Sequence, residues 1–367
     1  MEQKKRYSLA WAFILGIGIA GGACSSEELP GGDQAEVRLQ PHFFAATAET
    51  RSIVNGTAET AGTDKINTVG LYVTQSTGNA VYPGVTNGTA IFTKQKDDNW
   101  TGDVKLGSII ARLYAFSPSG STVVHANSGD THTIPVTLPA DQAFAGGNAG
   151  SEGNGWECSG TDYLYGTTKE AIEVTPANNI EASNTNFSPS IYLHHALAQV
   201  VFKLQTVSGR PVDDTYDFVK KITLTATGSN KYFKTGTGTM QLKDGVLGGL
   251  TAGKTLTFAP SNIANAVKCG ANTSPAVVAY GLVAPMTAAP AENSITLTFL
   301  LGKPIDSNTD GERELTVTIP KPVQWEKGKR YLYTLNLSNR AITVEGTTTI
   351  TGWNTSEDSG DMKPDGF

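Results

Sequence analysis

The side chains that could do acid–base or metal chemistry are few and scattered. Of five histidines, only His194 and His195 are adjacent. Neighbouring residues on a strand point to opposite faces, so these two could not share one metal ion. We therefore expect hydrogen-bonded, structural roles for the histidines, and the sequence predicts no metal site. The other three are His42, His125 and His132.

Paired carboxylates are the next candidates for catalysis. Asp97-Asp98 and Asp213-Asp214 lie in turn-like contexts, where Asp is favoured because its side chain bonds the local backbone. Neither spacing indicates the facing acids of a glycosidase. The chain has no Gly-x-Ser-x-Gly elbow and no Gly-rich phosphate loop before a helix. We expect no catalytic residue, no cofactor and no enzyme activity, unless the fold gathers distant acids in a cleft.

Cysteine chemistry is indicated at the start of the chain. Basic residues at 4–6 precede an uncharged run over 7–20, and small residues precede Cys24. This order is typical of a secretory signal, and the run is shorter than the ~20 apolar residues of a membrane span. Cys24 at the cut predicts a lipoprotein signal, with Cys24 acylated at the mature N-terminus. Gly21 stands where such signals usually have Leu, so an ordinary signal with an incidental cysteine stays open.

The composition favours a β-rich protein and argues against nucleic acid as a partner. The 367 residues include 40 Gly and 17 Pro but only 17% charged residues, which is typical of strands joined by turns. A net charge of -6 without a long basic run does not suit nucleic-acid binding. Attachment to the outer membrane would therefore come from lipid, because a multiply acylated cysteine supplies the two or more chains that stable anchoring needs.

The other two cysteines, Cys158 and Cys269, are far apart in the sequence. In an oxidising compartment they could form a disulfide. Sequence alone cannot establish the pairing, so two separate thiols remain the alternative.

The elements that would position these residues are strands. Residues 331–337 give the clearest signal, with Tyr331, Tyr333, Leu335 and Leu337 on one face. No long 3.6-residue period occurs, so we predict an all-β chain with two sandwich domains and Greek-key connections. The predicted parts are a signal peptide (1–23), a flexible tether (24–34), an N-terminal β-sandwich (35–187) and a C-terminal β-sandwich (188–367).

An ordered set of short motifs runs through the mature chain. The set begins with the signal ending at Cys24 and the Thr50-Arg51 pair. In the first half it continues with Leu113-Tyr114-Ala115-Phe116-Ser117-Pro118 and Asp162-Tyr163-Leu164-Tyr165-Gly166. In the second half it has a Leu-His-His-Ala-Leu-Ala-Gln-Val-Val-Phe run over 193–202, Gly-Lys-Arg-Tyr-Leu-Tyr-Thr-Leu over 328–335, and Ile350-Thr351-Gly352-Trp353. Together they resemble the fimbrillin-like lipoproteins of Gram-negative anaerobes, whose members form pilus stalks and tips.

The resemblance implies a fold and a route of assembly. The fold would be two transthyretin-like β-sandwich domains in tandem. A trypsin-like surface protease would cut after an Arg and release the first strand, and a strand from another fimbrial subunit would fill the groove. An open strand edge over an apolar core is a template for such β-augmentation.

Carried over to this chain, the removable strand and its cleavage site lie within 35–51. The cut would follow Arg51 and leave Ser52 as the new N-terminus. Arg38 is the alternative, but it lies within the strand pattern, where a protease could not easily reach it. Arg51 could also be an ordinary exposed arginine.

The donor strand is less well defined. The family's donor is attributed to the C-terminal region, but the chain after Trp353 is short, polar and acidic. The segment 342–350, released from its own sheet, is the other candidate. Alternatively, the protein is a non-polymerising surface lipoprotein: a tip adhesin, an anchor subunit, or a module that binds a glycan or protein through loops such as 143–160.

Overall fold

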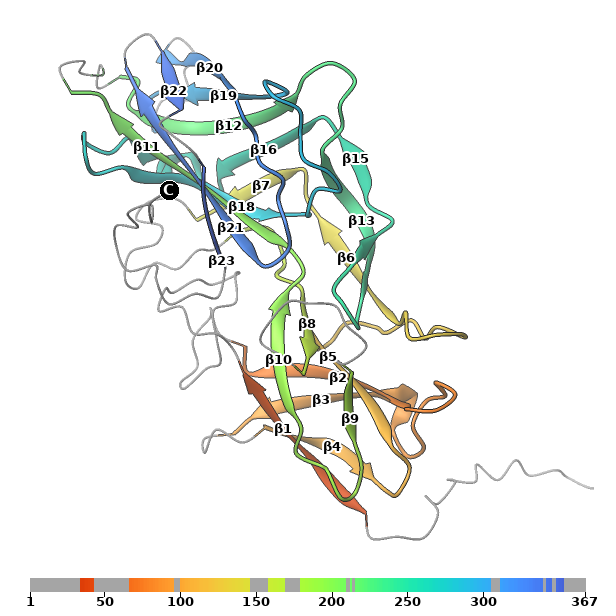
Figure 1. The fold of residues 1–367 in the computed structure, drawn as a ribbon. Helices are drawn as coiled ribbons and strands as arrows, with labels where there is room; N and C mark the ends of the chain where they lie inside the picture. The colour runs from red at the N-terminus through yellow and green to blue at the C-terminus, as the bar shows by residue number, and fades with distance from the viewer. Residues whose placement is uncertain are drawn as a thin grey trace, which may run out of the picture.

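The described chain is built almost entirely of β-strands (Figure 1). No α-helix occurs among the described residues, and the short helical segments there are 3₁₀ turns such as η1 (Thr86–Gly88). The all-β prediction is confirmed. The computed structural model describes residues 34–42, 66–95, 100–145, 158–168, 179–208, 212, 215–304, 311–338, 341–344 and 348–352.

The first sheet lies in the lower part of Figure 1. Its strands are β1 (Ala35–His42), β2 (Thr68–Gln75), β3 (Thr89–Lys94), β4 (Trp100–Leu106), β5 (Ala111–Ser117), β8 (Leu164–Thr167), β9 (Ile180–Ala182) and β10 (Ser190–His195). Their order is β2-β3-β4-β1-β10-β8-β5-β9, and β2 also pairs with β5. The path of pairing therefore returns on itself. It encloses a first core that includes Val37, Leu71, Phe92, Trp100, Leu113 and Ile191.

The upper part of Figure 1 contains two facing sheets. One has the order β18-β11-β21-β22, with β23 also on β21; these are β11 (Ala198–Thr206), β18 (Ala276–Val283), β21 (Lys329–Leu337), β22 (Ile342–Val344) and β23 (Thr349–Gly352). The other has the order β20-β19-β12-β16-β7, with β17 on β12; these are β7 (Asp141–Phe144), β12 (Phe218–Ala226), β16 (Thr255–Pro260), β17 (Val267–Lys268), β19 (Ile295–Leu301) and β20 (Arg313–Ile319).

A smaller sheet lies beside these two. β13 (Phe233–Gln241) pairs with β6 (Thr133–Leu138) on one edge and with β14 (Leu247–Gly248) and β15 (Thr251–Gly253) on the other. Several packed sheets are what β-sandwich domains require. The Greek-key connections stay a prediction.

Strand pairing does not divide at residue 187. β6 and β7 precede that position, yet they pair with β13 and β16 of the upper sheets. β10 follows it, yet it pairs with β1 and β8 of the first sheet. The chain thus passes between the lower and upper parts more than once, and the predicted domain limits stay a prediction.

How many residues of a strand are buried depends on whether one or both faces of the strand are covered by other parts of the protein. In β19, buried and half-buried residues alternate, as expected for a strand with one face on a core. In β11 nearly every residue is buried on both faces. β11 lies between β18 and β21, so both of its edges are also paired.

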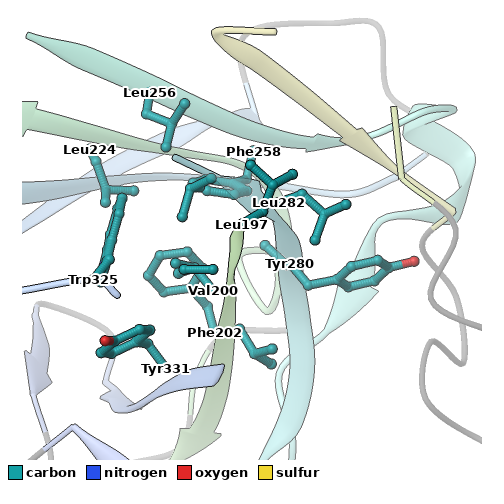
Figure 2. Close-up of a cluster of buried hydrophobic side chains, with 14 of the residues drawn as sticks. Leu197, Val200, Phe202, Leu224, Leu256, Phe258, Tyr280, Leu282, Trp325 and Tyr331 are labelled. Carbon is teal, nitrogen blue, oxygen red and sulfur yellow. The ribbon is translucent and has the colours of Figure 1, made fainter. Parts of the chain in front are cut away.

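The second core fills the space between the upper sheets. Figure 2 shows Val200 and Phe202 of β11 converging with side chains of β12, β16 and β18. The ring of Phe202 stacks on Tyr333 at 5.4 Å between centroids and meets Phe258 edge-on at 5.4 Å. Trp325 Nε1 donates to Tyr333 Oη at 3.0 Å, which satisfies both polar groups inside the core.

Replacing Phe202 with alanine tests how much this packing contributes. Phe202 is fully buried, so Phe202→Ala should lower the free energy of unfolding by about 3–5 kcal/mol through lost transfer energy and a cavity. Phe202→Leu, which fills most of the space, should lower it less. Urea unfolding of the three proteins measures both effects. Equal stability of Phe202→Ala and the parent chain would contradict this account of the core.

Candidate functional site

The first strand occupies a linking position in its sheet. β1 pairs antiparallel with β4 over its first half and parallel with β10 over its second half, where Gln40 lies opposite Ser190. Between the two halves, the Arg38 N–H donates to the carbonyl of Phe187 at 2.9 Å. In the described residues β4 and β10 do not pair with each other. β1 is therefore the strand that joins them.

Over residues 36–38, the side chains of β1 alternate between solvent and core. Val37 is fully buried in the first core, whereas Glu36 and Arg38 on either side are exposed. An alternating strand of this kind fixes its register, because a slip of one residue would bring a charged side chain into the core.

Loss of β1 would turn this place into a groove. The edges of β4 and β10 would each be left with unpaired N–H and C=O groups, and the position of Val37 would be empty. Such a groove favours another extended segment with an apolar residue at that point. The interaction needs only main-chain hydrogen bonds and burial, so no chemical step is involved.

The end of the described chain covers a second edge. β22 and β23 pair antiparallel with successive parts of β21, from Leu337↔Ile342 to Lys329↔Gly352. Ile342 is 3% exposed, whereas Ile350 is 46% exposed. β22 is thus anchored in the second core, while β23 is held mainly by its backbone.

Several predicted site residues lie outside the described residues. These are the lipidation site Cys24, the processing site Arg51-Ser52, the acid pairs Asp97-Asp98 and Asp213-Asp214, and most of the loop 143–160. The alternative cleavage site, Arg38, is described. Its backbone is paired in β1, which supports the argument that a protease could not easily reach it.

The two remaining cysteines are thiols that contact different carbonyl groups. Cys158 Sγ lies 3.7 Å from the oxygen of Gly160, and Cys269 Sγ lies 3.5 Å from that of Gly270. Burial, helped by nearby Asp217, raises the pKa of Cys269 to about 12. No disulfide joins them in the described structure.

The adjacent histidines take separate structural partners. His194 Nε2 lies 2.9 Å from Thr167 Oγ1, and His195 Nδ1 lies 2.9 Å from a carboxylate oxygen of Asp162. Both rings are buried. The prediction of hydrogen-bonded roles for this pair is confirmed. Within the described ranges, no three His, Cys, Asp or Glu side chains are close enough to hold a metal ion.

A second histidine cluster was not foreseen. Ala126 N–H donates to His132 Nδ1 at 3.1 Å, so the proton of the neutral ring is on Nε2, which donates to Asn79 Oδ1 at 2.9 Å. His125 stacks on His132 at 5.0 Å and bonds Tyr72 Oη through Nδ1 at 2.6 Å. These residues come from β2, a turn and the segment between β5 and β6, so sequence spacing gives no signal for the cluster.

Burial keeps the ring of His132 neutral. His132 is fully buried, and burial, followed by repulsion from His125, lowers its pKa from 6.5 to about 4. The neutral ring is the form that fits the observed hydrogen bonds, because its Nδ1 must accept.

The comparisons with known proteins identify the family. The fimbrillin-like family model matches residues 50–353, and the chain belongs to this family. A candidate cell adhesion protein from Bacteroides uniformis has a similar fold, with a TM-score of 0.50 and 13% identity over 87% of this chain and 99% of the other. A fimbrial protein from Bacteroides vulgatus aligns with a TM-score of 0.48 and 13% identity over 88% of this chain and 100% of the other.

No protein of curated function matches the chain. Among the described residues, no helix is long and apolar enough to cross a membrane.

The hold on β1 can be tested with trypsin. Trypsin can cleave after Arg38 only when β1 leaves the sheet. Val37→Ala removes two buried methyl groups, and a loss of roughly 1–3 kcal/mol should raise the open population, and with it the cleavage rate, by about tenfold or more. Glu36→Ala, at an exposed position, is the matched control and should leave the rate unchanged. Equal cleavage of both variants would show that Val37 does not hold β1.

The histidine cluster predicts a dependence of stability on pH. Because the pKa of His132 is about 4 in the folded state and 6.5 in its ordinary state, the unfolded chain binds more protons between these values. Stability should therefore fall as the pH decreases from 6.5 towards 4, by on the order of 1–3 kcal/mol from this residue.

The test compares urea unfolding at pH 7 and pH 4.5. His132→Asn keeps an acceptor for Ala126 N–H but has no proton to bind, so its stability should change less between the two pH values. An unchanged difference would mean that other groups produce the pH dependence.

Proposed function

We propose that the chain is a structural subunit of a cell-surface fimbria with no catalytic activity. It is exported as a lipoprotein, processed after Arg51 and joined to other fimbrial subunits by strand exchange in support of adhesion. The observation that carries the proposal is the position of β1 between β4 and β10. Removal of β1 would leave one edge of each of these strands unpaired and the buried site of Val37 unfilled. Membership of the fimbrillin-like family supports the fimbrial role.

The proposed cut lies where release of β1 is feasible. β1 ends at His42, and Arg51 follows it before β2 begins at Thr68. A cut there would separate β1 from the rest of the chain without breaking a described strand.

The donor segment we propose is 342–352. β23 contributes little buried apolar side chain, so it could leave the edge of β21 first. β22 would follow only if the site of the buried Ile342 were filled or closed. A head-to-tail contact between such a donor and the groove of another subunit does not close on itself, so it produces a filament.

The proposed location follows from the first cysteine. Cys24, acylated after removal of 1–23, would hold the unprocessed chain at the outer membrane, with 24–34 as a tether. Cleavage after Arg51 by a trypsin-like surface protease would then remove both the lipid anchor and β1 in one step.

Processing can be read from the N-terminus of the protein in intact cells. Mass spectrometry should find the parent chain beginning at Ser52 without lipid. Arg51→Ala should leave a chain that begins at acylated Cys24 and forms no fimbriae by electron microscopy. The matched control, Arg38→Ala, should be processed as the parent is.

Other outcomes separate the alternatives. A parent chain that begins at acylated Cys24, with the surface protease present, would overturn the polymerising role and favour a non-polymerising lipoprotein such as an adhesin or anchor subunit. A cut after Arg38 in the parent would place the processing site inside β1.

A further inference from the structure

One nearly continuous strand runs through both parts of the molecule. β10 of the first sheet and β11 of the upper sheet are separated only by Ala196 and Leu197 (Figure 1). Both residues are fully buried. The Ala196 N–H donates to the carbonyl of Tyr163, and the Leu197 carbonyl accepts from the N–H of Gly328, each at 2.8 Å. The passage between the two parts is thus fixed on both sides.

β11 is joined to β21 by a long parallel ladder. The two strands pair in one register, without a shift, from Gln199↔Arg330 to Thr206↔Leu337. Parallel ladders have evenly spaced hydrogen bonds along their whole length.

Side chains on directly opposite residues reinforce this ladder every three residues. Near its start a buried guanidinium donates to a buried amide, at its centre two rings stack, and near its end two amides bond. The pairs are Arg330 Nε to Gln199 Oε1 at 2.6 Å, Phe202 with Tyr333 at 5.4 Å between centroids, and Gln205 Nε2 to Asn336 Oδ1 at 3.0 Å.

We propose that the β11–β21 ladder is the tension-bearing joint of the chain. The covalent path from β10 enters β11 at its first residue, and the chain leaves β21 after its last residue, Leu337. Because the strands are parallel, these points are at opposite ends of the ladder. Tension between them makes the strands slide past one another, so the backbone bonds carry the force together. If both strands were instead pulled from the same end of the ladder, the backbone hydrogen bonds would break one after another.

The direction of tension rests on the proposed function; the strength of the joint does not. In the proposed filament, a donor strand would occupy the groove beside β10, and the segment after β21 would enter the next subunit. Tension along the filament would therefore reach the ladder at opposite ends. A single chain can be pulled in this direction without any assembly, so failure of the joint and failure of polymerisation are separate results.

Single-molecule force spectroscopy with two pairs of attachment points tests the proposal. In a full chain with its three native cysteines replaced by alanine, Ser190→Cys with Ser338→Cys pulls the ladder from opposite ends. Ser208→Cys with Ser338→Cys pulls it from one end. We expect the first geometry to require roughly twofold or more force for rupture at the same loading rate, since forced unfolding is governed by the unfolding rate of the loaded contacts. Equal forces in the two geometries would overturn the proposal.

A substitution within the ladder gives an independent reading. Gln199→Ala removes the amide that accepts from Arg330 at the end of the ladder far from Ser208 and Ser338, so it should lower the rupture force in the opposite-end geometry only. Asn230→Ala, in a turn between β12 and β13, is the matched control and should change neither force. A fall of equal size in both geometries would show a general loss of stability and contradict a role in bearing tension.

Discussion

Ala196 and Leu197 carry the chain from one hydrophobic core into the other, and this short passage sets how the first sheet, which contains β10, meets the upper sheet that contains β11. Neither residue is exposed, and both backbones are hydrogen-bonded to neighbouring segments. The second core also extends onto the first sheet, because Tyr72, Tyr114 and Tyr165 belong to it. The two parts therefore share packed side chains as well as a nearly continuous strand.

β1 is held in its sheet in a different way from β11. β11 has partner strands on both edges over most of its length, whereas each half of β1 pairs with a different strand. Main-chain hydrogen bonds do not depend on sequence, so any extended segment with a suitable apolar residue could reproduce most of what β1 contributes. A strand that closes a sheet in this manner is replaceable in a way that β11 is not. The physical difference lies in the topology rather than in the strength of single contacts.

The sequence could predict the elements whose pattern is local. Alternation identified the strand at 331–337, and the structure has β21 there; β1 lies within the removable segment placed at 35–51. It could not predict partners that are distant in the chain, such as the parallel pairing of β7 with β16. The cluster around His132 was hidden for the same reason, since Asn79 and His132 are 53 residues apart.

Pro135 shows how a proline can lie within a paired strand without breaking the ladder. A proline makes a central strand unfavourable, yet β6 forms through this residue. The N–H groups of Thr133 and Thr137 donate to Val124 O and Tyr163 Oη, away from β13. Backbone direction alternates along a strand, so the nitrogen of Pro135, midway between them, also faces away from β13. The proline therefore removes no hydrogen bond from that ladder.

The last segment of the described chain has two competing roles under the proposed function. β22 and β23 cover the outer edge of β21, and an uncovered edge invites unwanted pairing. As a donor, the same segment would leave that edge. The uneven burial of Ile342 and Ile350 offers a way to divide the roles, because β23 can separate while β22 still protects the adjoining part of β21. Since β11 pairs with the opposite edge of β21, neither step disturbs the β11–β21 ladder. Donor release and resistance to tension thus depend on different edges of one strand, and a subunit could exchange strands while its central ladder stays intact.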